Sequence, residues 1–190
     1  TKVKQLFIDE LEKIEWVYKL SPETINIPAN GEVQEIQVFN LYLKQKNISK
    51  EILKTIDQAI PSPIIFVLRF DSFLKYQLTY KRINEADPAR WVITDYFGTD
   101  WMPSTKNKNE LPVKLDLDSL YSEIIQWFLP YPKKNEEMIR EHVERVLLIQ
   151  QKEKEVAKLE KKLKNEKQFK YQVEINRILN KTKIEIEKLK

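Results

Sequence analysis

The acidic side chains of the first 130 residues are the groups whose types and spacing could support catalysis in this sequence. Restriction-type nucleases hold Mg²⁺ with one acidic residue and a D/E-x-K element on an adjacent strand. Asp71 follows a strongly apolar segment and Lys81 lies on the next predicted strand, but Thr79 stands where the second acid is needed. The spacing predicts that Asp71 is a turn residue and Lys81 a solvated strand lysine, and it leaves a metal-dependent nuclease as the least favoured function.

Two further pairs of aspartates are close in the sequence. Asp95 and Asp100 flank a turn, and Asp116 and Asp118 precede a predicted helix. Carboxylate oxygens are suitable ligands for a divalent cation, but loop geometry and helix capping explain the same residues, with Asp118 at the helix start. His142 lies on a predicted helix without other metal-ligand types nearby, so we expect a half-buried structural histidine.

The composition excludes most common enzyme classes. The 190 residues contain no cysteine, one histidine and two glycines, Gly31 and Gly98. Disulfides, zinc–thiolate sites and cysteine nucleophiles are therefore excluded, and the widely separated glycines cannot form a phosphate-binding loop. We expect no catalytic residue, no metal site and no cofactor.

Aromatic residues offer two possible binding surfaces. Tyr76, Tyr80, Lys75 and Lys81 lie on one predicted strand, as in sheets that stack single-stranded nucleic acid, but packing within the sheet is the favoured interpretation. Trp101 and Met102 lie in a polar loop, where they form either a protein interface or a plug folded back onto the sheet.

The elements that must position these residues belong to an α+β domain covering residues 1–132. Apolar periodicity predicts helices at 2–15, 50–59 and 120–129, and strands at 16–20, 33–45, 64–69, 74–83 and 91–96. Ser49 is the expected N-cap of the second helix. Strands able to pair in antiparallel fashion, interspersed with helices, predict a mostly antiparallel sheet with helices on one face.

Residues 133–190 form a second region with a different composition, because they contain neither glycine nor proline. One heptad seam runs through Ile175, Leu179, Thr182, Ile186 and Leu189, and a second, out of phase with it, through Val156, Leu159 and Leu163. The phase change indicates either a stutter in a long coiled coil or an antiparallel hairpin turning at residues 164–168. We expect the long coiled coil, paired in a dimer or against the body, because no glycine serves a turn.

The second region is also basic. Residues 134–190 carry sixteen basic and eleven acidic side chains, a net charge of +5, whereas the preceding residues carry −1. Such a region can bind phosphates non-specifically, although a solvated helix face is the favoured interpretation. The predicted nucleic-acid contacts are Lys158, Lys161, Lys162, Lys164, Lys167 and Lys170.

Four stretches carry a family resemblance, namely residues 20–39, 59–68, 96–103 and 161–176 (LSPETINIPANGEVQEIQVF, AIPSPIIFVL, YFGTDWMP and KKLKNEKQFKYQVEIN). The sequence resembles an uncharacterised bacterial family catalogued as a domain of unknown function. The resemblance implies a small cytoplasmic protein encoded beside helicases and DNA methyltransferases in restriction-type or phage-defence loci. It implies no activity.

These observations favour a non-catalytic accessory or interaction protein. The helical arm would drive homodimer formation or dock on a protein partner such as a helicase or DNA methyltransferase, and non-specific nucleic-acid binding is the alternative. The expected interface residues are Trp101, Met102, Ile175, Leu179, Ile186 and Leu189. We expect no membrane partner, because no apolar run is long enough to span a bilayer, and a cytoplasmic location, because cysteine and an export signal are absent.

Overall fold

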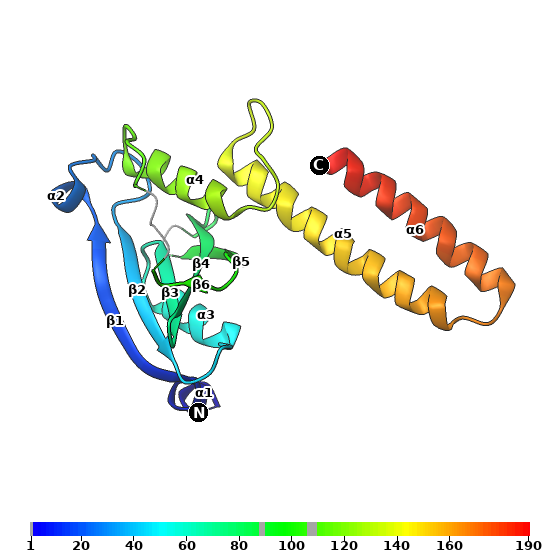
Figure 1. Ribbon diagram of the computed structural model, residues 1–190. Coiled ribbons are helices and arrows are strands. Elements are labelled where there is room, and N and C mark those ends of the chain that lie inside the picture. The colour runs from blue at the N-terminus through cyan, green and yellow to red at the C-terminus, as the bar shows by residue number, and fades with distance from the viewer. Residues whose placement is uncertain (1, 88–89, 106–109) are drawn as a thin grey trace. The chain divides into compact units, whose positions relative to one another are not determined.

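A computed structural model describes residues 2–87, 90–105 and 110–190 of the chain. The chain divides into two compact units, Thr1–Phe128 and Leu129–Lys190 (Figure 1). The change of composition at Lys133 lies just inside the second unit.

The first unit is built around one sheet. Its strands lie in the order β1-β2-β3-β4-β5, with the short β6 paired to β4. All pairs are antiparallel except β2 with β3, which are parallel because α3 connects them. The predicted α+β class with a mostly antiparallel sheet is confirmed. The elements are α1 (Lys2–Glu10), β1 (Leu11–Leu20), α2 (Pro22–Ile25), β2 (Ile36–Leu43), α3 (Lys50–Ala59), β3 (Ile64–Phe70), β4 (Phe73–Ile83), β5 (Trp91–Gly98), β6 (Met102–Pro103) and α4 (Leu117–Phe128).

The central strand β3 and the helix before it agree closely with the sequence pattern. β3 lies between β2 and β4, and its side chains Ile64, Phe66 and Leu68 are buried in a core cluster with residues of α3. The predicted bounds of α3 are confirmed, and Ser49 is its N-cap residue. Asp71, in the turn between β3 and β4, has a φ of 49°. Aspartate tolerates this left-handed conformation, so its predicted turn role is confirmed.

The prediction for residues 11–15 is wrong. The amphipathic helix expected at 2–15 ends at Glu10, and β1 begins at Leu11. Pairing with β2 overrides the local helical periodicity, because Leu11 lies opposite Leu43 and both side chains are buried in the core. Register shifts after Leu11 and Trp16 interrupt the alternation that would otherwise identify a strand in the sequence.

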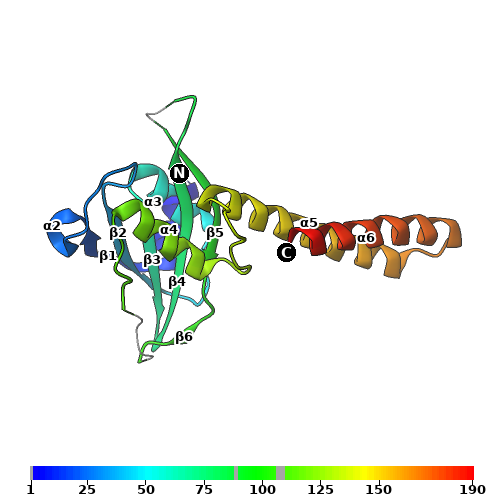
Figure 2. The ribbon, with the colours of Figure 1, turned by 90° about the horizontal axis from the view of Figure 1, so that it is seen from above.

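The second unit is an antiparallel helical hairpin. Helix α5 (Ile139–Asn165) and helix α6 (Phe169–Leu189) lie side by side in both views (Figures 1 and 2). A single long helix, the favoured expectation, is therefore wrong, and the alternative turn at residues 164–168 is confirmed. No glycine is needed, because the Glu166 carboxylate accepts hydrogen bonds from the backbone N–H groups of Lys167 and Gln168, each at 2.9 Å.

The heptad seam of α6 packs inside this hairpin. Ile175, Leu179 and Ile186 are buried, as is Ile149 of α5. Ion pairs of 2.6 Å between Lys152 and Glu185 and of 2.8 Å between Lys183 and Glu160 join the same two helices. Within the described residues, no helix has both the length and the apolar composition of a bilayer span.

Candidate functional site

The strongest candidate site is the hairpin tip, defined as residues 158–171. It comprises the last turns of α5, the connecting turn and the start of α6. The structure brings together at this tip all six lysines predicted to contact nucleic acid, and all six are exposed: Lys158, Lys161, Lys162, Lys164, Lys167 and Lys170.

The positive charge of the hairpin tip is not neutralised internally. The tip contains only two acidic residues, and both are engaged elsewhere. Glu160 pairs with Lys183 outside the tip, and Glu166 binds backbone N–H groups of the turn. In the described part of the chain, none of the six lysines forms an ion pair or a side-chain hydrogen bond. The ammonium groups are therefore available to an external anion.

Two exposed aromatic side chains accompany these lysines. Phe169 is 78% exposed and Tyr171 is 46% exposed at the start of α6. Sequence reasoning missed both residues, although their alternation with Lys170 in a charged stretch and their positions outside the heptad seam were visible signals. Cations beside exposed rings form the combination that proteins use for single-stranded nucleic acid, where rings stack on bases and ammonium groups contact phosphates.

The residues predicted to form an interface are not gathered in one place. Ile175, Leu179 and Ile186 lie in the buried seam of the second unit, with the partly buried Leu189 at its end. Trp101 packs against the core cluster of the first unit, as in the plug interpretation. Met102 belongs to β6 and lies opposite Leu74 of β4, and its side chain is partly exposed. Their role as partner contacts stays a prediction.

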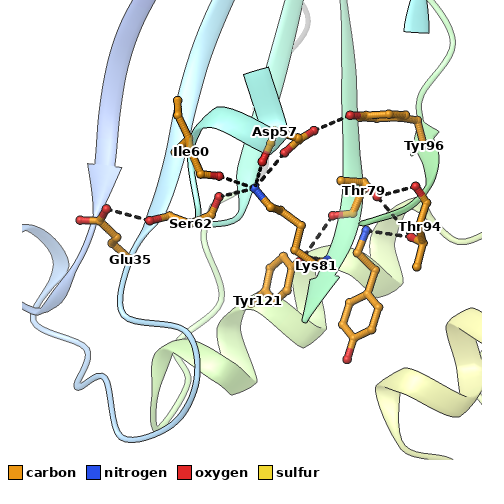
Figure 3. A network of polar contacts seen from close by, with 10 residues as sticks. Glu35, Asp57, Ile60, Ser62, Thr79, Lys81, Thr94, Tyr96 and Tyr121 are labelled. Carbon is orange, nitrogen blue, oxygen red and sulfur yellow. Dashed lines mark hydrogen bonds and ion pairs between the residues drawn. The ribbon is translucent and has the colours of Figure 1, made fainter. Parts of the chain in front are cut away.

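A second notable cluster is the buried network around Lys81, shown in Figure 3. The prediction of a solvated lysine is wrong, because the side chains of Lys81 and Asp57 are both 0% exposed. The Lys81 ammonium donates hydrogen bonds to three backbone carbonyls, those of Asp57 at 2.7 Å, Ile60 at 2.6 Å and Ser62 at 3.0 Å. These carbonyls lie at and just beyond the end of α3, where helical carbonyls lack backbone donors. Lys81 therefore caps this helix from β4.

Side chains from neighbouring elements complete the Lys81 network. The Asp57 carboxylate lies 3.3 Å from the Lys81 ammonium and accepts a 2.5 Å hydrogen bond from the Tyr96 hydroxyl. The Tyr121 hydroxyl of α4 accepts a hydrogen bond from the Lys81 backbone N–H and donates one to the Thr79 carbonyl. Strand β4 is thereby fixed to both α3 and α4.

Burial governs the ionisation of the Lys81 network. It lowers the pKa of Lys81 and raises the pKa of Asp57, although each attracts the other's charged form. Burial, together with the nearby Asp57 charge, also raises the pKa of Tyr96. Perturbed groups of this kind often mark active sites. Here the two charged side chains are closed off from solvent, so the network stabilises the fold and offers no substrate access.

A partly exposed polar cluster joins strands β1, β2 and β3. Glu15 accepts hydrogen bonds from Lys13 at 2.6 Å, Tyr42 at 3.0 Å and Asn40 at 3.3 Å. Asn40 in turn accepts one from Arg69 at 2.9 Å. The Lys13 hydrogen bond and those from Tyr42 and Asn40 lower the pKa of Glu15 to about 2. Glu15 therefore stays ionised at neutral pH and is a poor general base.

The predicted aspartate pairs do not form metal sites in the described chain. Asp116 caps α4 by accepting the Ser119 backbone N–H at 2.8 Å, so the predicted capping role of Asp118 is wrong. Asp118 instead accepts hydrogen bonds from the backbone of the loop after Gly31. A Cβ atom at Gly31 would lie 2.4 Å from the Asp118 carboxylate, so only glycine permits this approach.

The remaining pair and the histidine also have local explanations. Asp95 forms a 2.7 Å ion pair with Lys50, and Asp100 is exposed. His142 is buried, and its Nε2 atom lies 2.8 Å from the Tyr131 carbonyl. Among the described residues, no three histidine or acidic side chains gather in a group able to hold a metal ion.

The tyrosines of β4 face the inside of the first unit. Tyr80 is buried, and its ring stacks on that of Tyr121 in α4 with centroids 6.0 Å apart. Tyr76 contacts the Phe128 ring at 6.3 Å. Packing, the favoured interpretation, is therefore correct for these two residues, and α4 occupies the surface that a stacking platform would need.

Comparisons with known proteins identify the family alone. No curated protein and no solved structure matches the chain. The family described as Domain of unknown function (DUF4391) matches residues 1–186, and the chain therefore belongs to that family.

Proposed function

We propose that this chain is a non-catalytic accessory protein that binds nucleic acid through its hairpin tip. The observation that carries the proposal is the gathering of six exposed, unpaired lysines beside two exposed aromatic rings at one end of the hairpin. Either helix alone would distribute its charge along its length. The turn concentrates the charge by bringing Lys167 and Lys170 beside the last lysines of α5.

The type of cation supports contact with phosphates instead of recognition of a base sequence. All six groups are lysines, whose compact ammonium lacks the planar fork with which arginine reads guanine or binds phosphate bidentately. Phosphate contacts position a protein on nucleic acid but carry no sequence information. The proposed binding is therefore non-specific and strongly dependent on salt.

The aromatic residues favour single strands over duplexes. Phe169 and Tyr171 offer ring faces to solvent, and bases are free to stack on them only when they are unpaired. Stacking of this kind contributes about 1–3 kcal/mol per base. We expect the protein to bind an unstructured single strand more tightly than a duplex of the same length.

Titrations at several salt concentrations test the proposal. The variant Lys161→Glu with Lys162→Glu removes two tip cations, and the slope of log K against log salt should fall by about 0.7 for each phosphate of a single strand that the variant can no longer neutralise. Lys181→Glu with Lys188→Glu makes the same charge change on α6 outside the tip and should retain most of the affinity. Absence of binding at low salt, or equal weakening in both variants, contradicts the proposal.

A second candidate function is docking on a protein partner. Val173, Ile178 and Ile184 are exposed on α6 outside the buried seam, and exposed apolar side chains are typical of interfaces when they occur together. The family resemblance favours a helicase or DNA methyltransferase of a restriction-type or defence system as the partner. Self-association would have to use such outer residues, because the seam is already packed within the chain.

Co-purification distinguishes this second function from the first. The protein should retain a helicase or methyltransferase encoded beside it, and Val173→Lys with Ile184→Lys should abolish that retention while leaving the helical content unchanged by circular dichroism. Loss of retention with the tip variant alone would favour nucleic acid as the bridge between the two proteins.

A further inference from the structure

A pocket of about 260 Å³ lies in the first unit and shares no residue with the hairpin tip. Its walls come from the loop after β2, from the strands β3 and β4, and from the loop that precedes β6. The lining residues are Lys46, Asn47, Ile48, Leu68, Lys75, Gln77 and Trp101.

The polar side chains of this pocket have no ion-pair or hydrogen-bond partner among the described residues. Across the described residues, Lys46 and Lys75 form no ion pair, and the side-chain amides of Asn47 and Gln77 and the indole N–H of Trp101 form no hydrogen bond. None of the lining residues is acidic. The pocket therefore presents five sets of hydrogen-bond donors and two positive charges with no internal counter-charge, which favours an anion.

The apolar wall packs against the core and contacts one of the cations. It is formed by Ile48 and Trp101, which are partly exposed and pack against the core cluster that contains the buried Leu68. The Lys46 ammonium lies 5.0 Å from the centre of the Phe73 ring and 5.9 Å from that of Trp101, within the range of cation–π attraction. The backbone position of Trp101 is fixed by the adjacent pairing of Met102 with Leu74.

We propose that this pocket binds one nucleotide, with its phosphate on Lys46 and Lys75 and its base against the apolar wall. Two lysines match the double charge of a phosphate monoester. Asn47 and Gln77 carry both a donor and an acceptor, the pattern with which amides pair with base edges. The volume of about 260 Å³ lies just below the range of ligand pockets, roughly 300–1,000 Å³, so the pocket has room for one nucleotide at most and excludes a longer segment.

Two ligands carry a base together with a terminal phosphate, namely a free mononucleotide and the 5′-phosphorylated end of a strand. Calorimetric titration with 5′-AMP, and with a short single strand carrying either a 5′-phosphate or a 5′-hydroxyl, distinguishes them. Binding of AMP, with equal affinity for the phosphorylated and the 5′-hydroxyl strand, identifies a free nucleotide as the ligand. Tighter binding of the phosphorylated strand than of its 5′-hydroxyl counterpart identifies a strand end.

Matched variants separate the pocket from other surfaces. Lys75→Gln and Lys46→Gln should each weaken binding of the phosphate-bearing ligand at least about tenfold, because each removes a charge-assisted hydrogen bond. Lys54→Gln, an exposed lysine of α3, should leave the affinity unchanged. Adenosine, which has no phosphate, should bind the unmodified protein more weakly than AMP and should be insensitive to Lys75→Gln.

The proposal is overturned if millimolar AMP and the phosphorylated strand both leave the backbone amide NMR signals of the pocket residues unchanged. It is also overturned if Lys46→Gln and Lys75→Gln bind AMP as tightly as Lys54→Gln does. These outcomes are independent of the hairpin tip, because Lys161→Glu with Lys162→Glu should leave AMP binding intact. Failure of one site therefore does not decide the other.

Discussion

Lysines in the two units of this molecule have opposite environments. Lys81 is enclosed, with three carbonyls and one carboxylate around its ammonium. The six lysines of the hairpin tip are exposed and have no such partners in the described chain. A charge whose ligands are supplied by its own fold serves stability, whereas a charge left without ligands is available for binding. This contrast separates structural cations from those proposed to bind a ligand more clearly than net charge does.

The largest loss of stability is expected from removing the buried ammonium group of Lys81. Lys81→Met leaves Asp57 buried without its counter-charge and three carbonyls without a donor, so unfolding should require about 3–5 kcal/mol less free energy. Urea denaturation of the variant measures this decrease. The tip variant Lys161→Met should change stability by no more than about 0.5 kcal/mol. Similar decreases at both positions would contradict the contrast.

A double variant sharpens the same comparison. Asp57→Asn added to Lys81→Met removes the stranded charge but keeps an acceptor for Tyr96, so the double variant should be more stable than the sum of the two single changes predicts. Simple additivity would show that the two side chains act independently.

A smaller loss of stability is expected from removing Arg145, which pairs with Glu137 in the second unit. Arg145 binds Glu137 through two hydrogen bonds of 2.6 and 2.9 Å and also donates to the carbonyls of Leu189 and Pro132. Arg145→Met should destabilise the hairpin by about 2 kcal/mol. Hydrogen exchange should rise most in the last turn of α6, and uniform exchange along α6 would argue against an Arg145 clamp.

The pair of Arg145 and Glu137 also predicts that the stability of the protein decreases at acid pH. The hydrogen bonds from Arg145 lower the pKa of Glu137 to about 2, from an ordinary value of 4.5. Its contribution to stability is therefore complete above about pH 4.5 and is lost as the pH falls toward 2. The melting temperature should fall less between pH 4.5 and pH 2 for Glu137→Gln than for the unmodified chain. If the two melting temperatures fall in parallel, Glu137 is not a source of the acid dependence.

The smallest effect on stability, and a large effect on binding, is expected at the rings of the tip. Phe169→Ser should leave the melting temperature within error, since the side chain is 78% exposed. It should weaken single-strand binding by about 1–3 kcal/mol while leaving the salt slope unchanged. Fluorescence anisotropy at two salt concentrations separates these two quantities, and a change in the slope would assign the weaker binding to the lysines.

Local patterns predicted the elements that are held together by local forces. The bounds of α3 followed from its apolar stripe, from Ser49 before it and from the prolines after it, and those of β3 from its continuous apolar run. The first half of β1 did not follow, because its partner lies some thirty residues away and two register shifts hide its alternation. Sequence spacing alone also could not decide between a long helix and a hairpin, since the contacts that distinguish them pair α5 with α6 over long sequence separations.

The two classes of lysine differ in how far the sequence can identify them. The basic tip was visible as a cluster in the sequence. Lys81 was not, because a strand lysine between polar neighbours gives the same alternation whether its face meets solvent or the end of a helix. One signal was present. The segment around Ser62 is flanked by Pro61 and Pro63, which supply no N–H group, so nearby carbonyls needed a donor from elsewhere.

The position of Lys81 on β4 also has a consequence for biosynthesis. The residues of α3 and β3 leave the ribosome before Lys81 does, so the end of α3 is made without the cation that satisfies its carbonyls. That cation arrives only when β4 pairs with β3 in the antiparallel register that sets Lys81 beneath the helix. Nascent chains that end before Lys81 should therefore leave the last turn of α3 frayed, and completion of the first unit should be cooperative with the docking of β4.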